Sequence, residues 1–386
     1  MFHDALVPFA ERRIIKMKNK SKKKRILIVV SIILTIFIII AILLFRQIPK
    51  ILFPEYEPPR VTGSYEVSEE EYTWVDENRI ETYTDTGENR SVTIKIWYPA
   101  EEGTYPLVIF SHGSLGMIDS NYSTCMELAS NGYVAVSVAH PYQAIYVKDT
   151  NGNTTYIDKG FLQEVTNGNG DDTPEHEETV YHLQQKWMAV REGDVNFVLD
   201  TLLEKAAAEE PGAFTRIDPE KIGLFGHSLG GATAVAVGRE RTDIDAVIDL
   251  EGTMLGEYTG YENEAYSFNE KPYPVPILDV NSRVVYEEAV SITGNDSQTS
   301  DASGGYVNFY VIEHAADGHS AIFEDAGHLN FTDLPIISPT LAGMLGVGSV
   351  DPGTCIENVN EMVLHFFDYY LKDASTLDIK EIYNAE

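Results

Sequence analysis

A serine between glycines stands in a context that favours nucleophilic chemistry. Residues 226–230 read GHSLG, a G-x-S-x-G pattern that follows the apolar segment 222–225 and precedes the helical pattern 229–239. A strand, a sharp turn and a helix in this order project a serine hydroxyl from a strained turn, and the flanking glycines leave room for it. The sequence therefore predicts Ser228 as a nucleophile for acyl transfer.

A serine hydroxyl needs a base, and four later histidines are candidates because the usual chain order in this context is serine, acid, histidine. His365 falls on the apolar face of the last predicted helix, and His314 closes a predicted strand. His319 and His328 both fall in the loop expected between the last strand and the last helix. From position alone, His319 and His328 both remain candidates for the base.

Three carboxylates can orient that histidine. Asp249 ends the strand predicted at 246–250, Glu251 follows two residues later, and Asp279 lies in the strand predicted at 275–280. Because an apolar residue follows Asp279 at once, its side chain is expected inside the strand rather than at its mouth. The sequence favours Asp249, then Asp279, and places Glu251 third.

The oxyanion formed in acyl transfer needs two preorganised donors. One is the backbone N–H of Leu229, directly after the nucleophile, and the loop at 111–116 (SHGSLG) offers the N–H of Ser114 as the second. His112 is expected to fix this loop rather than to act in catalysis. The acidic run at 171–178 is more typical of a solvated helix start than of a metal site, and the chemistry of a serine triad needs neither a metal nor an organic cofactor.

Apolar runs of strand length alternate with helical patterns, which predicts an α/β domain at 73–374 with a mostly parallel sheet and helices on both faces. Strands are expected at 92–98, 107–111, 134–139, 222–225, 246–250, 275–280 and 307–313, and helices at 121–130, 179–207, 229–239, 284–290 and 361–371. The polar stretch 143–178 is interpreted as an insertion. Its Asn-Gly pair at 151–152 favours the turn of a hairpin over a calcium loop.

The N-terminal region predicts a membrane anchor. Residues 26–45 are twenty uncharged positions, long enough to cross the hydrocarbon core as a helix. The basic cluster at 16–25 places the N-terminus in the cytoplasm and the domain outside. The remaining segments are a basic cytoplasmic tail (1–25, of which 1–16 is a possible start-site extension), a linker (46–72) and a C-terminal tail (375–386).

The exterior region is strongly acidic. After residue 50 the chain carries 17 basic and 58 acidic side chains, which excludes a nucleic-acid partner because such a surface repels phosphate. No obligatory protein partner is inferred. The two cysteines, Cys125 and Cys355, do not make a disulfide framework, and whether they pair is open.

In combination these segments resemble the plasma-type platelet-activating factor acetylhydrolases and their bacterial relatives, within the α/β-hydrolase superfamily. The resemblance rests on residues 92–100 (VTIKIWYPA), 110–116 (FSHGSLG), 128–141 (LASNGYVAVSVAHP), 217–220 (IDPE), 226–233 (GHSLGGAT), 280–282 (VNS) and 328–333 (HLNFTD). It implies an α/β-hydrolase fold and calcium-independent release of short or oxidised acyl chains from phospholipids or related esters. It also implies Asp249 as the acid and His328, which opens an H-x-N-F segment, as the base.

The expected function is therefore that of a membrane-anchored extracellular serine ester hydrolase with Ser228, Asp249 and His328 as its triad. The strong acidity favours a neutral, zwitterionic or soluble ester over an anionic lipid surface. Two alternatives are a catalytically silent surface binding protein and an acyltransferase acting on a cell-surface acceptor. Ser114, the polar insertion and extra residues before His328 depart from the family pattern, so the acyl and head-group preference stays open.

Overall fold

The structure, a computed structural model, describes residues 48–168, 173–293 and 306–384. The membrane helix expected at 26–45 lies outside these ranges. Within them, no helix combines the length and apolar character needed to cross a bilayer.

The chain divides into two units. The smaller comprises Met1–Tyr56 and Ile337–Thr340, and in its described part the carbonyl of Ile51 accepts a hydrogen bond from Thr340 Oγ1 at 3.2 Å. The larger comprises Glu57–Ile336 and Leu341–Glu386 and contains the sheet and the candidate site.

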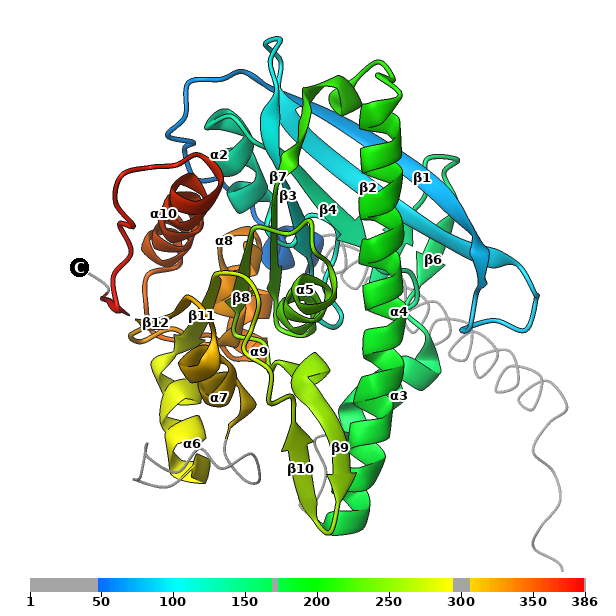
Figure 1. Cartoon of the computed structure of the whole chain (residues 1–386), viewed down its shortest axis with the longest axis vertical. Coiled ribbons are helices and arrows are strands. Elements are labelled where there is room, and N and C mark those ends of the chain that lie inside the picture. The colour runs from blue at the N-terminus through cyan, green and yellow to red at the C-terminus, as the bar shows by residue number, and fades with distance from the viewer. Residues whose placement is uncertain (1–47, 169–172, 294–305, 385–386) are drawn as a thin grey trace, which may run out of the picture. The chain divides into compact units, whose positions relative to one another are not determined.

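A sheet of nine strands, counted within the described residues, forms the centre of the larger unit (Figure 1). In spatial order the strands are β1 (Val67–Ile80), β2 (Asn89–Pro99), β4 (Val134–Ala139), β3 (Tyr105–Ser111), β7 (Ile217–His227), β8 (Ala246–Leu250), β11 (Ile277–Ser282), β12 (Gly318–Phe323) and β13 (Ile382–Tyr383). β2 is antiparallel to both β1 and β4, whereas all neighbours from β4 to β13 run parallel. This confirms the predicted mostly parallel sheet and is consistent with an α/β-hydrolase fold.

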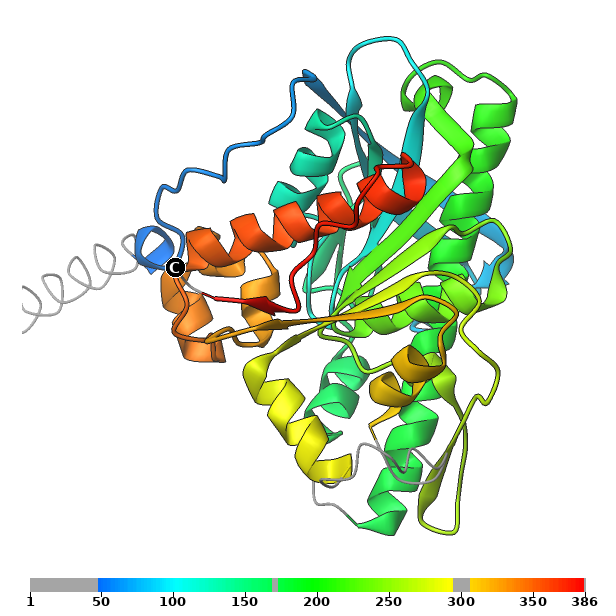
Figure 2. The ribbon, with the colours of Figure 1, turned by 60° about the vertical axis from the view of Figure 1, so that its left-hand side comes forward.

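Helices cover both faces of the sheet (Figure 1 and Figure 2). On β3, Leu107 and Ile109 pack into the core beneath α4 (Pro174–Ala207), α5 (Leu229–Glu240) and α7 (Val307–His314). Val108 and Phe110 pack into the opposite core beneath α2 (Tyr122–Ser130) and α10 (Pro352–Leu371). Successive side chains of a strand point to opposite faces, so an uninterrupted apolar strand predicts this two-sided burial.

One predicted strand is wrong. Segment 307–313 is rich in β-branched and aromatic residues, which favour a strand, yet it forms α7. Its apolar residues Val307, Tyr310 and Val311 have helical spacing and all enter the core. The next strand is β12, at Gly318–Phe323. The other predicted strands are all found, with ends shifted by a few residues.

Two ends of the domain differ from the expected boundaries. β1 begins at Val67, inside the segment expected to be a linker, and pairs with β2 over nearly its whole length. β13 lies inside the expected C-terminal tail and adds a short parallel edge beside β12. β1 is rich in acidic residues and β13 has only two residues, so neither shows an apolar strand pattern, and their pairing with a neighbouring strand makes them part of the sheet.

The described residues of the polar insertion at 143–178 form a hairpin, a short helix and the first turns of α4. The predicted hairpin is confirmed as β5 (Tyr146–Lys148) and β6 (Thr154–Tyr156), and a short helix α3 (Lys159–Asn167) follows. α4 begins at Pro174, earlier than predicted, because Thr173 caps it by accepting a hydrogen bond from the N–H of His176. The remaining elements are η1 (Ala213–Arg216), η2 (Leu255–Glu257), β9 (Tyr258–Glu262), β10 (Ala265–Phe268), α6 (Arg283–Thr293), η3 (His328–Phe331), α8 (Leu334–Ile337) and α9 (Pro339–Leu345).

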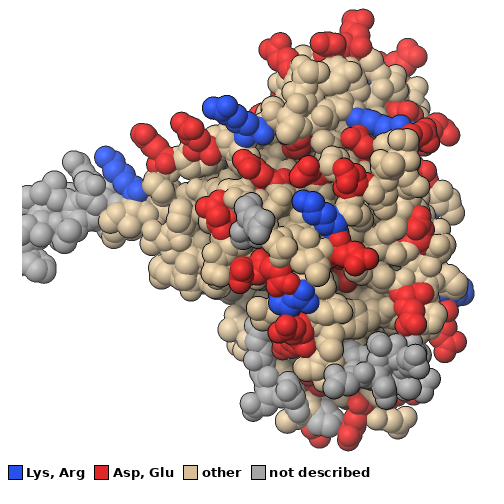
Figure 3. Space-filling view, turned by 90° about the vertical axis from the view of Figure 1, so that its left-hand side faces the viewer, with Lys and Arg blue, Asp and Glu red and all other residues tan. Residues whose placement is uncertain are grey.

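The acidic excess is carried by the surface. On the face in Figure 3, acidic side chains are spread widely and basic side chains are few and separate. Cys125 on α2 and Cys355 on α10 are both buried and unpaired, so the structure contains no disulfide between them.

Candidate active site

Ser228 occupies a sharp turn between β7 and α5. Its backbone has φ 57° and ψ −126°, a strained combination for a residue with a side chain, and its N–H donates to the carbonyl of Leu250 at 2.9 Å. A Cβ at Gly226 would lie 2.1 Å from the carbonyl oxygen of Gly230, and one at Gly230 would lie 1.9 Å from that of Ser111. The two glycines therefore allow the turn that lifts the hydroxyl out of the sheet.

Ser228 and His328 line one pocket with a volume of about 320 Å³. Ser114, Leu229 and Glu251 line it as well, so segments from across the larger unit meet there. Parallel strands direct their carboxyl ends to one edge of the sheet, and this edge is where open α/β sheets bind ligands. The pocket therefore contains a nucleophile, a base, a carboxylate and backbone donors.

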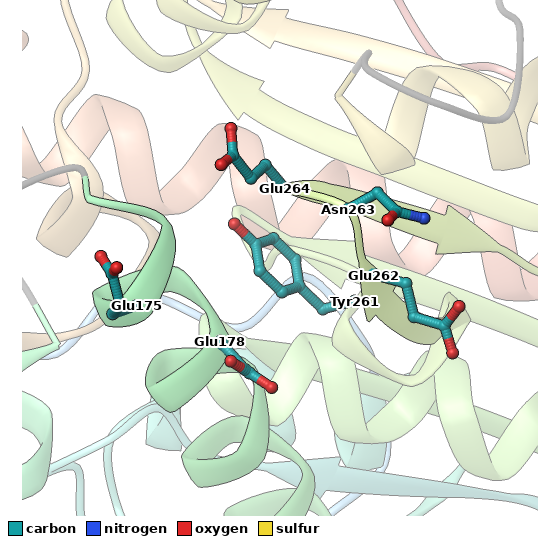
Figure 4. Close-up of a pocket in the computed structure, with 6 residues that line it drawn as sticks. All are labelled: Glu175, Glu178, Tyr261, Glu262, Asn263 and Glu264. Atoms are coloured by element: carbon teal, nitrogen blue, oxygen red, sulfur yellow. The ribbon is translucent and has the colours of Figure 1, made fainter.

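A larger pocket, of about 500 Å³, lies between the start of α4 and the β9–β10 hairpin (Figure 4). It is lined by Glu175, Glu178, Tyr261, Glu262, Asn263 and Glu264. Among the described residues, its lining holds neither a serine nor a histidine. In the part of the chain that the structure describes, no group of three His, Cys, Asp or Glu side chains is placed to hold a metal ion. The smaller pocket is therefore the candidate active site.

His328 is held by Glu251. The Nδ1 of His328 lies 2.7 Å from Oε2 of Glu251, whose side chain is 1% exposed. The other carboxylate oxygen of Glu251 accepts the N–H of Ser282 at 2.8 Å. A carboxylate partner fixes the proton on Nδ1 and leaves Nε2 as the acceptor. Among the described residues no hydrogen bond joins Nε2 to Ser228 Oγ, and such contacts are often long in ligand-free enzymes.

The expectation that Asp249 orients His328 is wrong in this structure. Asp249 Oδ1 accepts the N–H of Gly252 at 2.8 Å and lies against α5, where a Cβ at Gly231 would be 1.9 Å from it. Asp249 is still inside β8 and points into the interface between sheet and helix. Glu251, just past the strand with φ 55°, turns its side chain toward the pocket instead.

Asp279, the second choice from sequence, is the strand neighbour of Asp249. Its carboxylate accepts hydrogen bonds from Asn281 at 2.7 Å and Asn308 at 2.8 Å. Burial raises the pKa of Asp279 to about 7, and burial followed by the charge of Asp279 raises the pKa of Asp249 well above its usual value. These two carboxyls are buried structural groups rather than partners of His328.

The loop expected to donate to the oxyanion lies directly against the nucleophile. A Cβ at Gly113 would lie 3.1 Å from the Cβ of Ser228. The loop is fixed by the N–H of Leu115, which donates to the carbonyl of Gln143 at 3.1 Å. Ser114 lines the pocket at this point. The N–H of Leu229, in the first turn of α5, has no partner within its own helix.

Arg191 supports this loop and was missed by the sequence reasoning. It is fully buried, and its guanidinium donates to the carbonyls of His112 and of Gly113 (3.2 Å) and to Gln143 Oε1 (2.5 Å). Burial lowers the pKa of Arg191 to about 9. His112 donates from Nδ1 to the carbonyl of Gly113 at 2.7 Å and accepts the N–H of His140 at 3.3 Å, a structural arrangement like the one expected.

His227 and Asn330 fix the backbone around His328. The rings of His227 and His328 are 4.5 Å apart, and His227 Nε2 donates to the carbonyl of His328 at 2.9 Å. Burial first, and then His328, lowers the pKa of His227 well below its usual value, so its ring stays neutral. Asn330 Oδ1 accepts the N–H groups of Gly327 (2.9 Å) and Gly348 (2.8 Å). In the sequence, His227 could have been singled out because it directly precedes Ser228, and Asn330 because it follows His328 by two positions.

His319, the alternative base, is placed elsewhere. It lies on β12, where its Nε2 contacts Tyr370 Oη at 2.8 Å and Asp317 at 2.9 Å. It does not line the pocket of Ser228. Only His328, of the two loop candidates, shares a pocket with the nucleophile.

Comparison with known proteins assigns the family. The family model described as platelet-activating factor acetylhydrolase, isoform II, matches residues 99–380. The chain belongs to this family. The predicted resemblance is thereby confirmed, and Ser114, Ser228, Glu251 and His328 all lie within the matched range of the platelet-activating factor acetylhydrolase family.

Curated relatives include platelet-activating factor acetylhydrolases of Gallus gallus and Cavia porcellus. The first is 24% identical, with 69% of this chain and 62% of that protein covered. The second is 27% identical, with 69% and 58% covered, so the chain spans about six tenths of the length of these family members. A solved structure of a ferulic acid esterase from Streptomyces cinnamoneus has the same fold, with a TM-score of 0.59, 21% identity and coverage of 83% of this chain and 95% of that one.

Proposed function

We propose that this chain is a serine ester hydrolase that releases short acyl chains from phospholipid-like or other carboxylic esters. The observation that carries the proposal is the hydrogen bond of 2.7 Å between Glu251 and His328 in the pocket lined by Ser228. A nucleophile, a base and an acid that orients the base are the parts of a catalytic triad, and geometry rather than sequence position defines such a triad. A binding protein has no need of this arrangement.

In the proposed reaction, Ser228 Oγ attacks the ester carbonyl and passes its proton to Nε2 of His328. The N–H groups of Leu229 and Ser114 stabilise the negative charge on the carbonyl oxygen. His328 then gives the proton to the leaving alcohol, and Glu251 stabilises the charged imidazole throughout. Water, activated by the same histidine, releases the acid and restores Ser228. No step uses a metal or an organic cofactor.

The substrate class follows from the family and the charge. The named relatives are platelet-activating factor acetylhydrolases, which supports a phospholipid-like ester. A pocket of about 320 Å³ suits a short acyl group better than a long chain. With 17 basic and 58 acidic side chains after residue 50, the domain favours a neutral or zwitterionic ester over an anionic one.

The location is inferred from sequence alone. Residues 26–45 tether the protein to the cell membrane as a single span, with the basic residues 16–25 in the cytoplasm and the hydrolase domain outside. Protease added to intact cells is expected to remove the domain. Its survival until the cells are lysed would overturn the inferred orientation.

The function is tested with p-nitrophenyl esters from acetyl to palmitoyl, using the full chain in a neutral detergent with EDTA. Acetyl and butyryl esters are expected to turn over fastest, and Ser228→Ala should lose at least about 10³-fold in kcat. Ser320→Ala, an exposed serine on β12, serves as the matched control and should behave as wild type. Absence of Ser228-dependent turnover on every ester would overturn the proposal. A competing alcohol that captures most of the acyl group would identify an acyltransferase instead.

A further inference from the structure

Three apolar side chains that line the pocket of Ser228 pack together and form its apolar wall. They are Trp187, Leu229 and Leu255, which belong to one packed apolar cluster that also holds Met188 and Ala236. The indole of Trp187 is the largest side chain of that wall. Its position therefore decides how far the pocket extends on the apolar side.

The indole is clamped from α3, the helix of the polar insertion. Trp187 is 7% exposed, and its ring meets the ring of Phe161 edge to face at a centroid distance of 5.6 Å. Its Nε1 donates to Oε2 of Glu164 at 2.8 Å, and the second carboxylate oxygen of Glu164 pairs with Lys186 at 2.7 Å. Both the ring and the Nε1 of the indole are thus engaged, and a ring held in this way cannot swing aside without losing these contacts.

The polar and the apolar lining residues of the pocket suit the two halves of an ester. The leaving alcohol must approach His328, because His328 supplies its proton. The lining residues Glu251 and Thr253 are also polar. An acyl chain is apolar and gains free energy where it covers apolar surface, which is the wall of Trp187, Leu229 and Leu255.

We propose that Trp187, clamped by Glu164 and Phe161 of the inserted helix α3, sets the length of acyl chain that the site accepts. The indole closes the apolar side of the pocket, so short acyl groups fit and longer ones meet the ring. The space behind it is filled by apolar side chains, including Met188 at 2% exposure. Removing the indole therefore extends an apolar pocket. This inference rests on the proposed ester hydrolase function and gives the insertion a role in specificity.

The test compares kcat/KM on acetyl, butyryl, octanoyl and palmitoyl p-nitrophenyl esters in the full chain. Trp187→Ala is expected to raise the ratio of octanoyl to acetyl kcat/KM at least about tenfold, since burying even two more methylenes of the longer acyl chain favours it by about that factor. Trp187→Leu should shift the ratio in the same direction by less. Glu164→Ala, which removes the clamp and leaves the indole, should give an intermediate shift. Trp74→Ala on β1 is the matched control, and its ratio should equal that of wild type.

The possible results distinguish a failure of the role proposed for Trp187 from a failure of the proposed esterase function. An octanoyl to acetyl ratio within twofold of wild type in Trp187→Ala and Trp187→Leu, with Ser228-dependent turnover retained, would overturn the role of Trp187 and leave the esterase standing. A shift in Trp187→Ala without one in Glu164→Ala would overturn the role of the inserted helix. Absence of Ser228-dependent turnover in the wild-type chain on all four esters would instead overturn the proposed function. Circular dichroism of each variant checks that it is folded.

Discussion

Oε2 of Glu251 accepts a hydrogen bond of 2.7 Å from Nδ1 of His328, a residue 77 positions later in the chain. Asp249, only two residues before Glu251, lies buried against α5 and accepts a hydrogen bond from the N–H of Gly252. The difference between the two carboxylates can be tested directly, because amide substitutions keep their shape and remove their charge.

Glu251→Gln is expected to lower kcat by roughly 10³- to 10⁴-fold, because the amide no longer stabilises the imidazolium and can favour the wrong tautomer of His328. Asp249→Asn is the matched control. Burial, and then the charge of Asp279, raises the pKa of the Asp249 carboxyl well above its usual value and so disfavours its charged form; an uncharged amide should therefore replace it with little change, and kcat should fall less than about tenfold. Steady-state kinetics on p-nitrophenyl acetate measure both. An inactive Asp249→Asn beside an active Glu251→Gln would restore Asp249 as the acid.

Arg191→Met is expected to lower kcat about 10- to 100-fold with little effect on KM, because the loop that carries Ser114 loses its anchor. The substitution also leaves the buried carbonyl of His112 and the side-chain oxygen of Gln143 without their donor, at about 1–3 kcal/mol each, whereas the carbonyl of Gly113 keeps Nδ1 of His112 as a donor. The melting temperature should fall accordingly. Arg241→Ala, which removes ion pairs with Asp200 and Asp243 away from the pocket of Ser228, is the control. Unchanged kcat in a folded Arg191→Met would argue against a link between this arginine and the oxyanion loop.

His140 predicts a loss of stability in acid. Burial, then the charge of Arg191, lowers its pKa from near 6.5 to about 4, against the opposing contacts with Asp194. Between these pH values the unfolded chain binds the proton and the folded chain does not, so the free energy of unfolding falls as the pH falls. The loss amounts to about 3 kcal/mol for this group.

The measurement is urea unfolding at pH 7, 6, 5 and 4 for wild type, His140→Gln and His365→Gln. Only the difference between variants isolates His140, because buried carboxyls such as Asp333, whose pKa burial raises to about 7, act in the opposite direction over the same range. His140→Gln should lose less stability on acidification than wild type, and His365→Gln should follow wild type. Parallel curves for wild type and His140→Gln would refute the assignment.

Gly230→Ala is expected to destabilise the fold by more than about 4 kcal/mol, because its Cβ would lie 1.9 Å from the carbonyl oxygen of Ser111. Gly260→Ala is the matched control, since a Cβ there meets nothing within 4 Å. Melting temperatures of the two variants, measured side by side, provide the comparison. A Gly230→Ala protein as stable as Gly260→Ala would show that the turn at Ser228 does not need its glycine.

Local patterns in the sequence were sufficient to predict those elements whose structure depends mainly on neighbouring residues in the chain. The apolar runs of β3, β4 and β8 predict buried parallel strands because both faces must be covered. The turn at Ser228 was predictable because the G-x-S-x-G pattern is local: a Cβ at Gly226 would meet the carbonyl of Gly230, four residues later, whereas the contact of Gly230 with Ser111 on β3 appears only in the tertiary structure. The hairpin of β5 and β6 followed from its Asn-Gly turn, which fixes the chain reversal by itself.

The sequence by itself determined the family, the mostly parallel sheet and the position of the strained serine. Only the tertiary structure decided which carboxylate meets His328 and that segment 307–313 is helix α7. It also decided that Arg191 and Trp187 reach the pocket region from the long helix α4. The physical reason is common to these cases. Each case depends on contacts with residues from distant parts of the chain. At Val307, packing into the core overrides the strand propensity of the local sequence. Asp249 points from β8 against α5, whereas Glu251, just past the end of β8, points toward His328.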